Sequence, residues 1–173
     1  MAVGSGLMRI RRQDAKAWFD QHAEAFAAYN ADEIDVDTWW KRRVQADRGL
    51  IRRGHEAVPF AVEMLHNRNP DIREDGAGVL AALGDDEGVI DELLGALEAE
   101  VEDQPRDAMI EALGHLKNRR AIPYLAHVIR DVDTDGDTRW SAVEALGRIV
   151  RRRFDRQPDA FNAALGWLDS HGF

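Results

Sequence analysis

Residues 105–118 read Pro105-Arg-Asp-Ala-Met-Ile-Glu-Ala-Leu-Gly-His-Leu-Lys-Asn118, and this stretch recurs twice in the chain. Residues 138–151 repeat it as Thr138-Arg-Trp-Ser-Ala-Val-Glu-Ala-Leu-Gly-Arg-Ile-Val-Arg151, and residues 72–85 as Ile72-Arg-Glu-Asp-Gly-Ala-Gly-Val-Leu-Ala-Ala-Leu-Gly-Asp85. A fixed period of this length indicates a stack of similar structural units. The positions that return every 33 residues are an arginine (Arg73, Arg106, Arg139) and a leucine (Leu80, Leu113, Leu146).

Each unit contains two segments with the apolar spacing of an amphipathic helix. In the middle unit Ile90, Leu93 and Leu97 form the first apolar face, and Met109 and Leu113 begin the second. A pair of such helices cannot bury its apolar faces alone, so the units must stack. We therefore predict an all-α solenoid, a right-handed superhelix of about three helix pairs.

The solenoid is expected to be one domain spanning residues 1–173, with three repeats at 54–153. Residues 1–53 are predicted to form N-terminal capping helices, at Asp14–Tyr29 and Thr38–Arg53. Residues 154–173 are predicted to form a C-terminal cap, with a helix at Pro158–Ser170. Terminal units of atypical sequence are what a solenoid requires for solubility.

Two short patterns resemble the HEAT-repeat family, especially the short-repeat subclass related to phycobilisome lyases. They are Arg-x₅-Ala-Leu-Gly-x-Leu/Ile in the second helix and Ala121-Ile-Pro-x-Leu at the start of the first. The resemblance covers about residues 54–153, and the first unit departs from it by having Ala81 where the others have Gly114 and Gly147. It implies a fold and says little about function, because such repeats serve as scaffolds, lyase subunits and enzymes.

The resemblance also implies that the second helix of each repeat lines a concave surface. The positions one, five and nine residues after the repeating arginine would then form a groove. We expect this groove to be acidic, with Trp140 as an aromatic anchor, unless the next element buries that ring. The predicted partner-binding residues are Glu74, Asp107, Glu111, His115, Trp140, Glu144 and Arg148; Gly78 and Ala82 complete the set of positions.

Charge is unevenly distributed along the chain. The formal net charge is −9, and residues 85–111 contain eleven acids and one base. Residues 41–53 and 148–156 are instead basic. Such asymmetry reflects either solvated helix faces or a field that attracts a partner. The net acidity argues against duplex nucleic acid, whose binding is driven by basic surface, and favours a partner with a basic surface.

Two further sets of residues carry specific expectations. The repeating arginines, near Asp71, Asp103 and Asp137, are expected to join adjacent loops through their planar fork of donors. The loop Asp131-Val-Asp-Thr-Asp-Gly-Asp137 resembles the start of an EF-hand calcium loop, with carboxylates at Asp131, Asp133, Asp135 and Asp137. Position 12 of that loop needs a bidentate acid and is Ala142 here, so helix capping is the favoured interpretation.

The sequence contains no phosphate-binding glycine loop and no nucleophile elbow. A single His55-Glu56 pair falls short of the several pairs that HEAT-like di-iron hydroxylases need. We therefore expect neither a cofactor nor catalysis. The sequence has no apolar run long enough for a membrane span and no evident secretory signal, so the cytoplasm is the expected compartment.

The function we predict is a non-enzymatic protein-binding module whose acidic concave face holds a basic segment. One alternative is a small acidic immunity-type protein that neutralises a cationic toxin, since opposite fields speed association. Another is a chromophore-lyase-like subunit that works with a partner chain.

Overall fold

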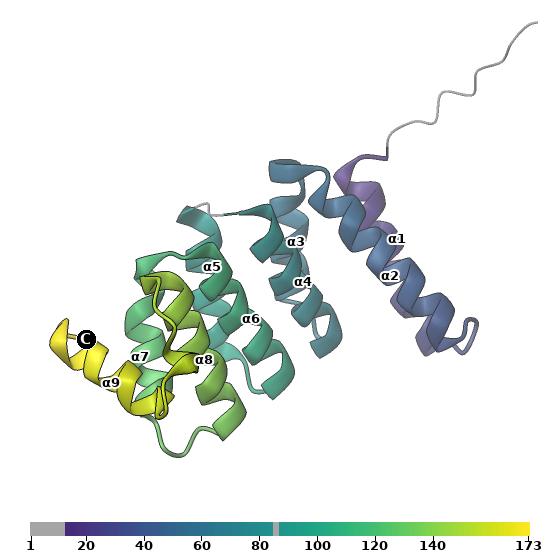
Figure 1. Cartoon of the computed structure of the whole chain (residues 1–173). Helices are drawn as coiled ribbons and strands as arrows, with labels where there is room; N and C mark the ends of the chain where they lie inside the picture. Colours follow the sequence, from purple (N-terminus) through teal and green to yellow (C-terminus); the bar gives the residue numbers. More distant parts are fainter. Residues whose placement is uncertain (1–12, 85–86) are drawn as a thin grey trace, which may run out of the picture. The chain divides into compact units, whose positions relative to one another are not determined.

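The computed structural model describes residues 13–84 and 87–173, and within them the chain is helical with no strand (Figure 1). This confirms the all-α prediction. The chain divides into two compact units, one ending at Arg53 and the other covering Gly54–Phe173. Residues 1–12 of the predicted N-terminal cap, and Asp85 and Asp86 of the acidic segment, lie outside the described residues.

The first unit is a pair of helices, α1 (Ala15–Asn30) and α2 (Val36–Ile51). The Trp18 ring packs on Gly49, where an added Cβ would lie 2.1 Å from a ring carbon. Phe26 meets Trp39 edge to face, with ring centroids 5.4 Å apart. α2 begins two residues before its predicted start because the carboxylate of Asp35 accepts a hydrogen bond from the Thr38 N–H and so caps the helix.

The second unit is built from three helix pairs and a terminal helix. The pairs are α3 (Val58–Leu65) with α4 (Pro70–Leu83), α5 (Glu87–Ala99) with α6 (Asp103–Leu116), and α7 (Ile122–Arg130) with α8 (Gly136–Val150). Short 3₁₀ turns stand at Gly54–Ala57, Arg119–Ala121 and Phe154–Arg156, the last called η3, and α9 is Ala160–Ser170. The second helices form a continuous layer, because α4 packs along α6 and α6 along α8. The first helices touch one another far less.

The repeating apolar positions form the core of this unit. Leu80, Leu113 and Leu146 are all fully buried, as the 33-residue period requires. Gly114 allows α6 and α8 to approach closely, since a Cβ there would lie 2.8 Å from the Cα of Ala145. Neighbouring repeats therefore meet backbone to backbone at this position.

The repeating arginines are structural, but they bond to backbone carbonyls rather than chiefly to the nearby aspartates. The guanidinium of Arg106 donates to the carbonyl of Glu100 at 2.9 Å, and its distance to the Asp103 carboxylate is 3.9 Å. The guanidinium of Arg139 donates twice to the carbonyl of Ile129, and that of Arg73 to the carbonyls of Asn67 and Arg68. In each repeat the arginine of the second helix thus satisfies carbonyls left open at the end of the first helix or just after it.

Helix α9 packs against α7 and α8 (Figure 1). The Phe161 ring of α9 lies under the guanidinium of Arg139, whose central carbon is 4.9 Å from the ring centroid. The same ring packs edge to face with Trp140, and the two ring centroids are 6.0 Å apart. Trp167 and Leu168 of the same helix are buried.

Candidate functional site

The predicted partner-binding residues occupy corresponding positions on α4, α6 and α8. Glu111, His115 and Trp140 are exposed, and the remaining four are partly exposed: Glu74, Asp107, Glu144 and Arg148. Because α6 and α8 lie side by side, their six residues form one surface. We call this surface the α6–α8 face: Asp107, Glu111, His115, Trp140, Glu144 and Arg148.

Trp140 stands at the beginning of α8 and is partly covered by the terminal helix. Its side chain is 38% exposed, and one edge rests on Phe161. The ring is thus held in place and still presents apolar surface to solvent, which suits an aromatic anchor.

Asp107 is the most distinctive group on the α6–α8 face. Its Oδ1 atom is shielded from solvent and makes no hydrogen bond to any residue that the structure describes. The buried hydroxyl oxygen of the neighbouring Thr138 likewise lacks a partner of acceptable geometry. Burial raises the pKa of Asp107, and the Thr138 hydroxyl only partly offsets that effect. A buried carboxylate oxygen without a hydrogen bond destabilises the folded protein. A partner that brings a hydrogen-bond donor to this oxygen removes that cost, so the position favours binding of such a partner.

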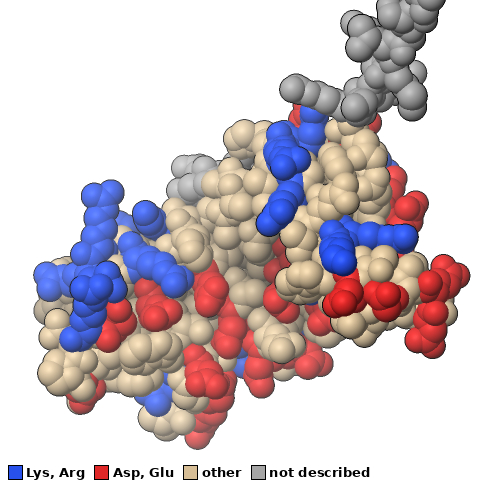
Figure 2. All heavy atoms as spheres, turned by 45° about the vertical axis from the view of Figure 1, so that its right-hand side comes forward, with Lys and Arg blue, Asp and Glu red and all other residues tan. Residues whose placement is uncertain are grey.

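Other carboxylates surround this position. Asp135, Asp103 and Glu111 each add to the rise in the pKa of Asp107 through repulsion between like charges. Figure 2 shows Asp and Glu side chains spread across the surface of the second unit, with Lys and Arg gathered at its edge on the left of the view. The potential near the start of α6 and α8 is therefore negative.

The α6–α8 face changes character toward the other end of its helices. Glu144 lies 3.6 Å from the guanidinium of Arg148, one turn further along α8. The Nδ1 atom of His115 lies 3.0 Å from the carbonyl of Glu111. The surface is thus acidic over the first turns of the helices and mixed or basic over the last.

Two of the four aspartates in the EF-hand-like loop, Asp131 and Asp135, accept local hydrogen bonds. Asp135 caps α8 by accepting from the N–H groups of Asp137 and Thr138. Asp131 accepts from the N–H of Asp133 and the hydroxyl of Thr134. Thr138 has the largest effect in lowering the pKa of Asp135, and the Thr134 hydroxyl has the largest effect in lowering that of Asp131. No three of the loop's acids, all of which are described, lie close enough together to share an ion.

Sequence reasoning missed Glu100, whose side chain is 2% exposed and accepts from both Arg73 and the backbone. It also missed a basic pocket at the ends of α6 and α8 that includes Lys117. The run of bases at 148–156 was a usable signal for that pocket. Nothing in the repeat pattern distinguished Glu100, because it lies at the end of α5, outside the aligned stretches.

Comparison with known protein families agrees with this architecture. A family model for HEAT repeats matches residues 90–171. Residues 90–171 carry HEAT repeats. The match supports the HEAT-repeat family in general, and the lyase-like subclass stays a prediction. No curated protein matches the chain.

HEAT repeats generally mediate protein–protein interaction, so the family favours a protein partner for this array. Within residues 13–84 and 87–173, none of the helices is both long enough and apolar enough to cross a membrane.

Proposed function

We propose that the chain is a non-enzymatic, cytoplasmic binding module whose α6–α8 face holds a basic segment of a protein partner. The unpartnered Oδ1 of Asp107 is the observation that carries this proposal. A lysine ammonium or an arginine guanidinium supplies the donor that this oxygen lacks, and it relieves the repulsion from the neighbouring carboxylates.

Trp140 supports the same assignment. Its exposed part lies on α8, and Thr138 in the first turn of that helix adjoins the Asp107 carboxyl. Arginine stacks on indole rings as well as pairing with carboxylates. A basic segment that contains arginine therefore finds both kinds of contact on one face.

A purely structural explanation of these charges is also available. Acids near helix starts and bases near helix ends stabilise the helix dipoles. That explanation accounts for Asp103 in the first turn of α6 and for Asp135 and Asp137 at the start of α8. It does not account for Asp107 and Glu111, which stand in the second and third turns of α6, where the dipole effect has faded.

An immunity-type protein that neutralises a cationic toxin is one specific form of this proposal. A toxin gene next to the gene for this chain supports it, and the lack of one counts against it. The chromophore-lyase-like alternative predicts a change in bilin absorbance on mixing with the chain, and an unchanged spectrum dismisses it.

The test compares two doubly substituted proteins in capture of partners from the native host. Glu111→Lys with Glu144→Lys reverses two charges on the α6–α8 face. Glu24→Lys with Glu98→Lys makes the same change in net charge on α1 and α5, where both side chains are exposed.

We expect the first variant to lose captured proteins that the wild type and the second variant retain. Circular dichroism and melting temperature should be nearly unchanged in both, because surface substitutions cost little stability. Equal capture by all three proteins, or equal loss in both variants, rejects the α6–α8 face as the binding surface.

A further inference from the structure

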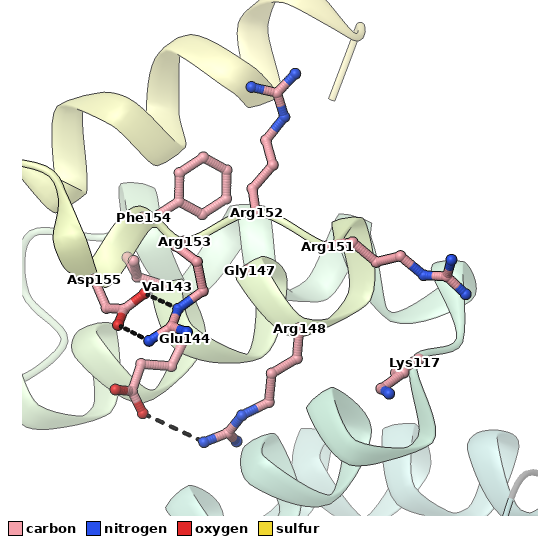
Figure 3. A pocket seen from close by; sticks show the side chains of 10 residues that line it. All are labelled: Lys117, Val143, Glu144, Gly147, Arg148, Arg151, Arg152, Arg153, Phe154 and Asp155. Atoms are coloured by element: carbon pink, nitrogen blue, oxygen red, sulfur yellow. Dashed lines mark hydrogen bonds and ion pairs between the residues drawn. The ribbon is translucent and has the colours of Figure 1, made fainter.

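A basic pocket of about 480 Å³ lies where α6 and α8 end (Figure 3). Glu144 and Arg148 of the α6–α8 face form part of its wall, so the pocket continues that face. Five cations line it against two carboxylates, Glu144 and Asp155. The cations are Lys117, Arg148, Arg151, Arg152 and Arg153.

Two of the cations are the residues that end the helices. Lys117 and Arg151 are the C-caps of α6 and α8, with φ of 55° and 58°. Glycine is the favoured residue in this left-handed conformation, because it has no Cβ. A long cation at both positions places two positive charges beside the negative ends of two neighbouring helices.

The turn after α8 builds the opposite wall. Gly147 permits it, because a Cβ there would lie 2.7 Å from the carbonyl oxygen of Arg152. The N–H of Arg152 donates to the carbonyl of Gly147 at 2.9 Å, and this hydrogen bond holds the turn in which the chain folds back against the end of α8. Phe154 is buried beneath it, so the wall is anchored to the core.

Most of the positive charge in the pocket is uncompensated. The side chains of Lys117, Arg151 and Arg152 form neither a hydrogen bond nor an ion pair within the part of the chain that the structure describes. The Nη1 atom of Arg148 is shielded from solvent and has no hydrogen-bond partner there. Figure 3 shows Lys117, Arg148 and Arg151 bordering the same open space.

Arg153, like Arg148 beside Glu144, already has an acidic partner. Its guanidinium donates two hydrogen bonds of 3.1 Å to the carboxylate of Asp155, and this pairing raises the pKa of Arg153 and lowers that of Asp155. The pocket therefore offers separate unpaired cations on its α6 and α8 side.

We infer that this pocket binds acidic side chains of the same partner segment whose basic residues lie along the α6–α8 face. The inference rests on the proposed function and specifies the partner as a segment with a basic stretch and an acidic end. The pocket volume is more than ten times that of a water molecule, and the cations are spread over the end of α6 and residues 148–153 at the end of α8. Several separate carboxylates suit that arrangement better than one compact phosphoryl group.

The helix geometry predicts the spacing of the two charges on the partner. Lys117, the C-cap of α6, stands ten positions after Asp107, which corresponds to about 15 Å along the helix axis. An extended segment covers that distance in about four to five residues. A lysine pair and a glutamate pair should therefore bind best with about four residues between them.

The test measures binding of synthetic peptides by isothermal titration at low salt. The first peptide has two lysines, a spacer of about four serines and glycines, and two glutamates; the second has glutamines in place of the glutamates. Each is titrated into the wild type, into Lys117→Gln with Arg151→Gln, and into a control, Arg119→Gln with Arg156→Gln. The control removes two exposed cations that do not line the pocket.

We expect replacement of the glutamates to weaken binding about five- to tenfold in the wild type and in the control. In the pocket variant the same replacement should change affinity less than about twofold. Shorter and longer spacers should bind more weakly than the spacer of about four.

The remaining outcomes separate this inference from the proposed function. If both peptides bind equally well to the wild type, the pocket does not take acidic residues, while the proposed function stands. If the glutamate effect persists in the pocket variant, the acidic end binds elsewhere and the inference is wrong. A peptide with one phosphoserine that binds much more tightly than the glutamate peptide overturns the carboxylate assignment. If neither peptide binds, both proposals fall.

Discussion

The guanidinium of Arg73 donates two hydrogen bonds, each 2.7 Å long, to the two carboxylate oxygens of Glu100. The two residues belong to successive repeats, and both side chains are shielded from water. One oxygen of Glu100 also accepts from the N–H groups of Val101 and Glu102. This single carboxylate thus joins the first repeat to the second and also closes the link between α5 and α6.

Removing the charge of Glu100 should destabilise the array. We expect Glu100→Gln to lower the free energy of unfolding by about 2–4 kcal/mol, because it leaves the largely buried Arg73 guanidinium without the carboxylate charge that compensates it. Urea denaturation followed by circular dichroism measures the change. The control is Asp91→Asn, which removes the exposed pair between Asp91 and Arg120 and should cost less than about 1 kcal/mol. Equal losses in the two variants would contradict the assigned role.

The same carboxylate should make stability depend on pH in the acid range. Burial acts to raise the pKa of Glu100, but the hydrogen bonds from Arg73 and the backbone outweigh it, so the pKa lies below its ordinary value of 4.5. The stabilisation is therefore complete above that value and is lost as the pH falls through the lowered pKa. The difference in unfolding free energy between wild type and Glu100→Gln should shrink steadily below about pH 4. A difference that stays constant from pH 7 to pH 3 would count against this explanation.

Asp107 should behave in the opposite way. Burial raises its pKa above the ordinary value of 3.8, so ionisation at neutral pH costs the folded state some stability. We expect Asp107→Asn to stabilise the protein by about 0.5 kcal/mol at pH 7 while weakening capture of the basic partner. The gain should disappear as the pH falls below about 3.8, where the carboxyl is protonated in both states. Lower stability at pH 7 would show that Asp107 serves the fold instead.

Two glycine-to-alanine substitutions should have opposite effects. Gly114→Ala places a Cβ 2.8 Å from the backbone of α8 and should cost about 1–3 kcal/mol, because α6 and α8 must move apart. Gly78 in α4 is exposed and has no atom within 4 Å of an added Cβ. Gly78→Ala should therefore stabilise the protein by about 0.5–1 kcal/mol through better helix propensity. Thermal or urea unfolding of both variants checks the pair.

The repeat pattern was sufficient to predict the fold because the period fixes which residues face the core. Leu80, Leu113 and Leu146 are all buried as that period requires. The role of the arginines was predicted only in part: the sequence indicated that they join loops, but not that carbonyl groups such as that of Ile129 accept their hydrogen bonds. Backbone acceptors leave no trace in a sequence, since every residue has one.

The candidate site was less accessible to sequence reasoning. The corresponding positions on α6 and α8 were identified, because a helix face follows from residue spacing. The unpartnered oxygen of Asp107 was not, since it depends on how the side chain of Thr138 packs beside it. The pocket needed Lys117 and Arg151 in one place, and only the stacking of α6 on α8 brings these two helix ends together.

Gly147 occupies the same repeat position as Gly114, yet its close neighbour is the returning chain at Arg152 rather than another helix. The surface that receives the terminal segment is thus the surface on which a fourth repeat would sit. If residues 118–150 were duplicated, each copy would have a glycine at the position of Gly147, and the second helix of the next copy could pack closely against it. Because each repeat contacts only its neighbours, such an array can gain or lose whole units without a change inside any single repeat.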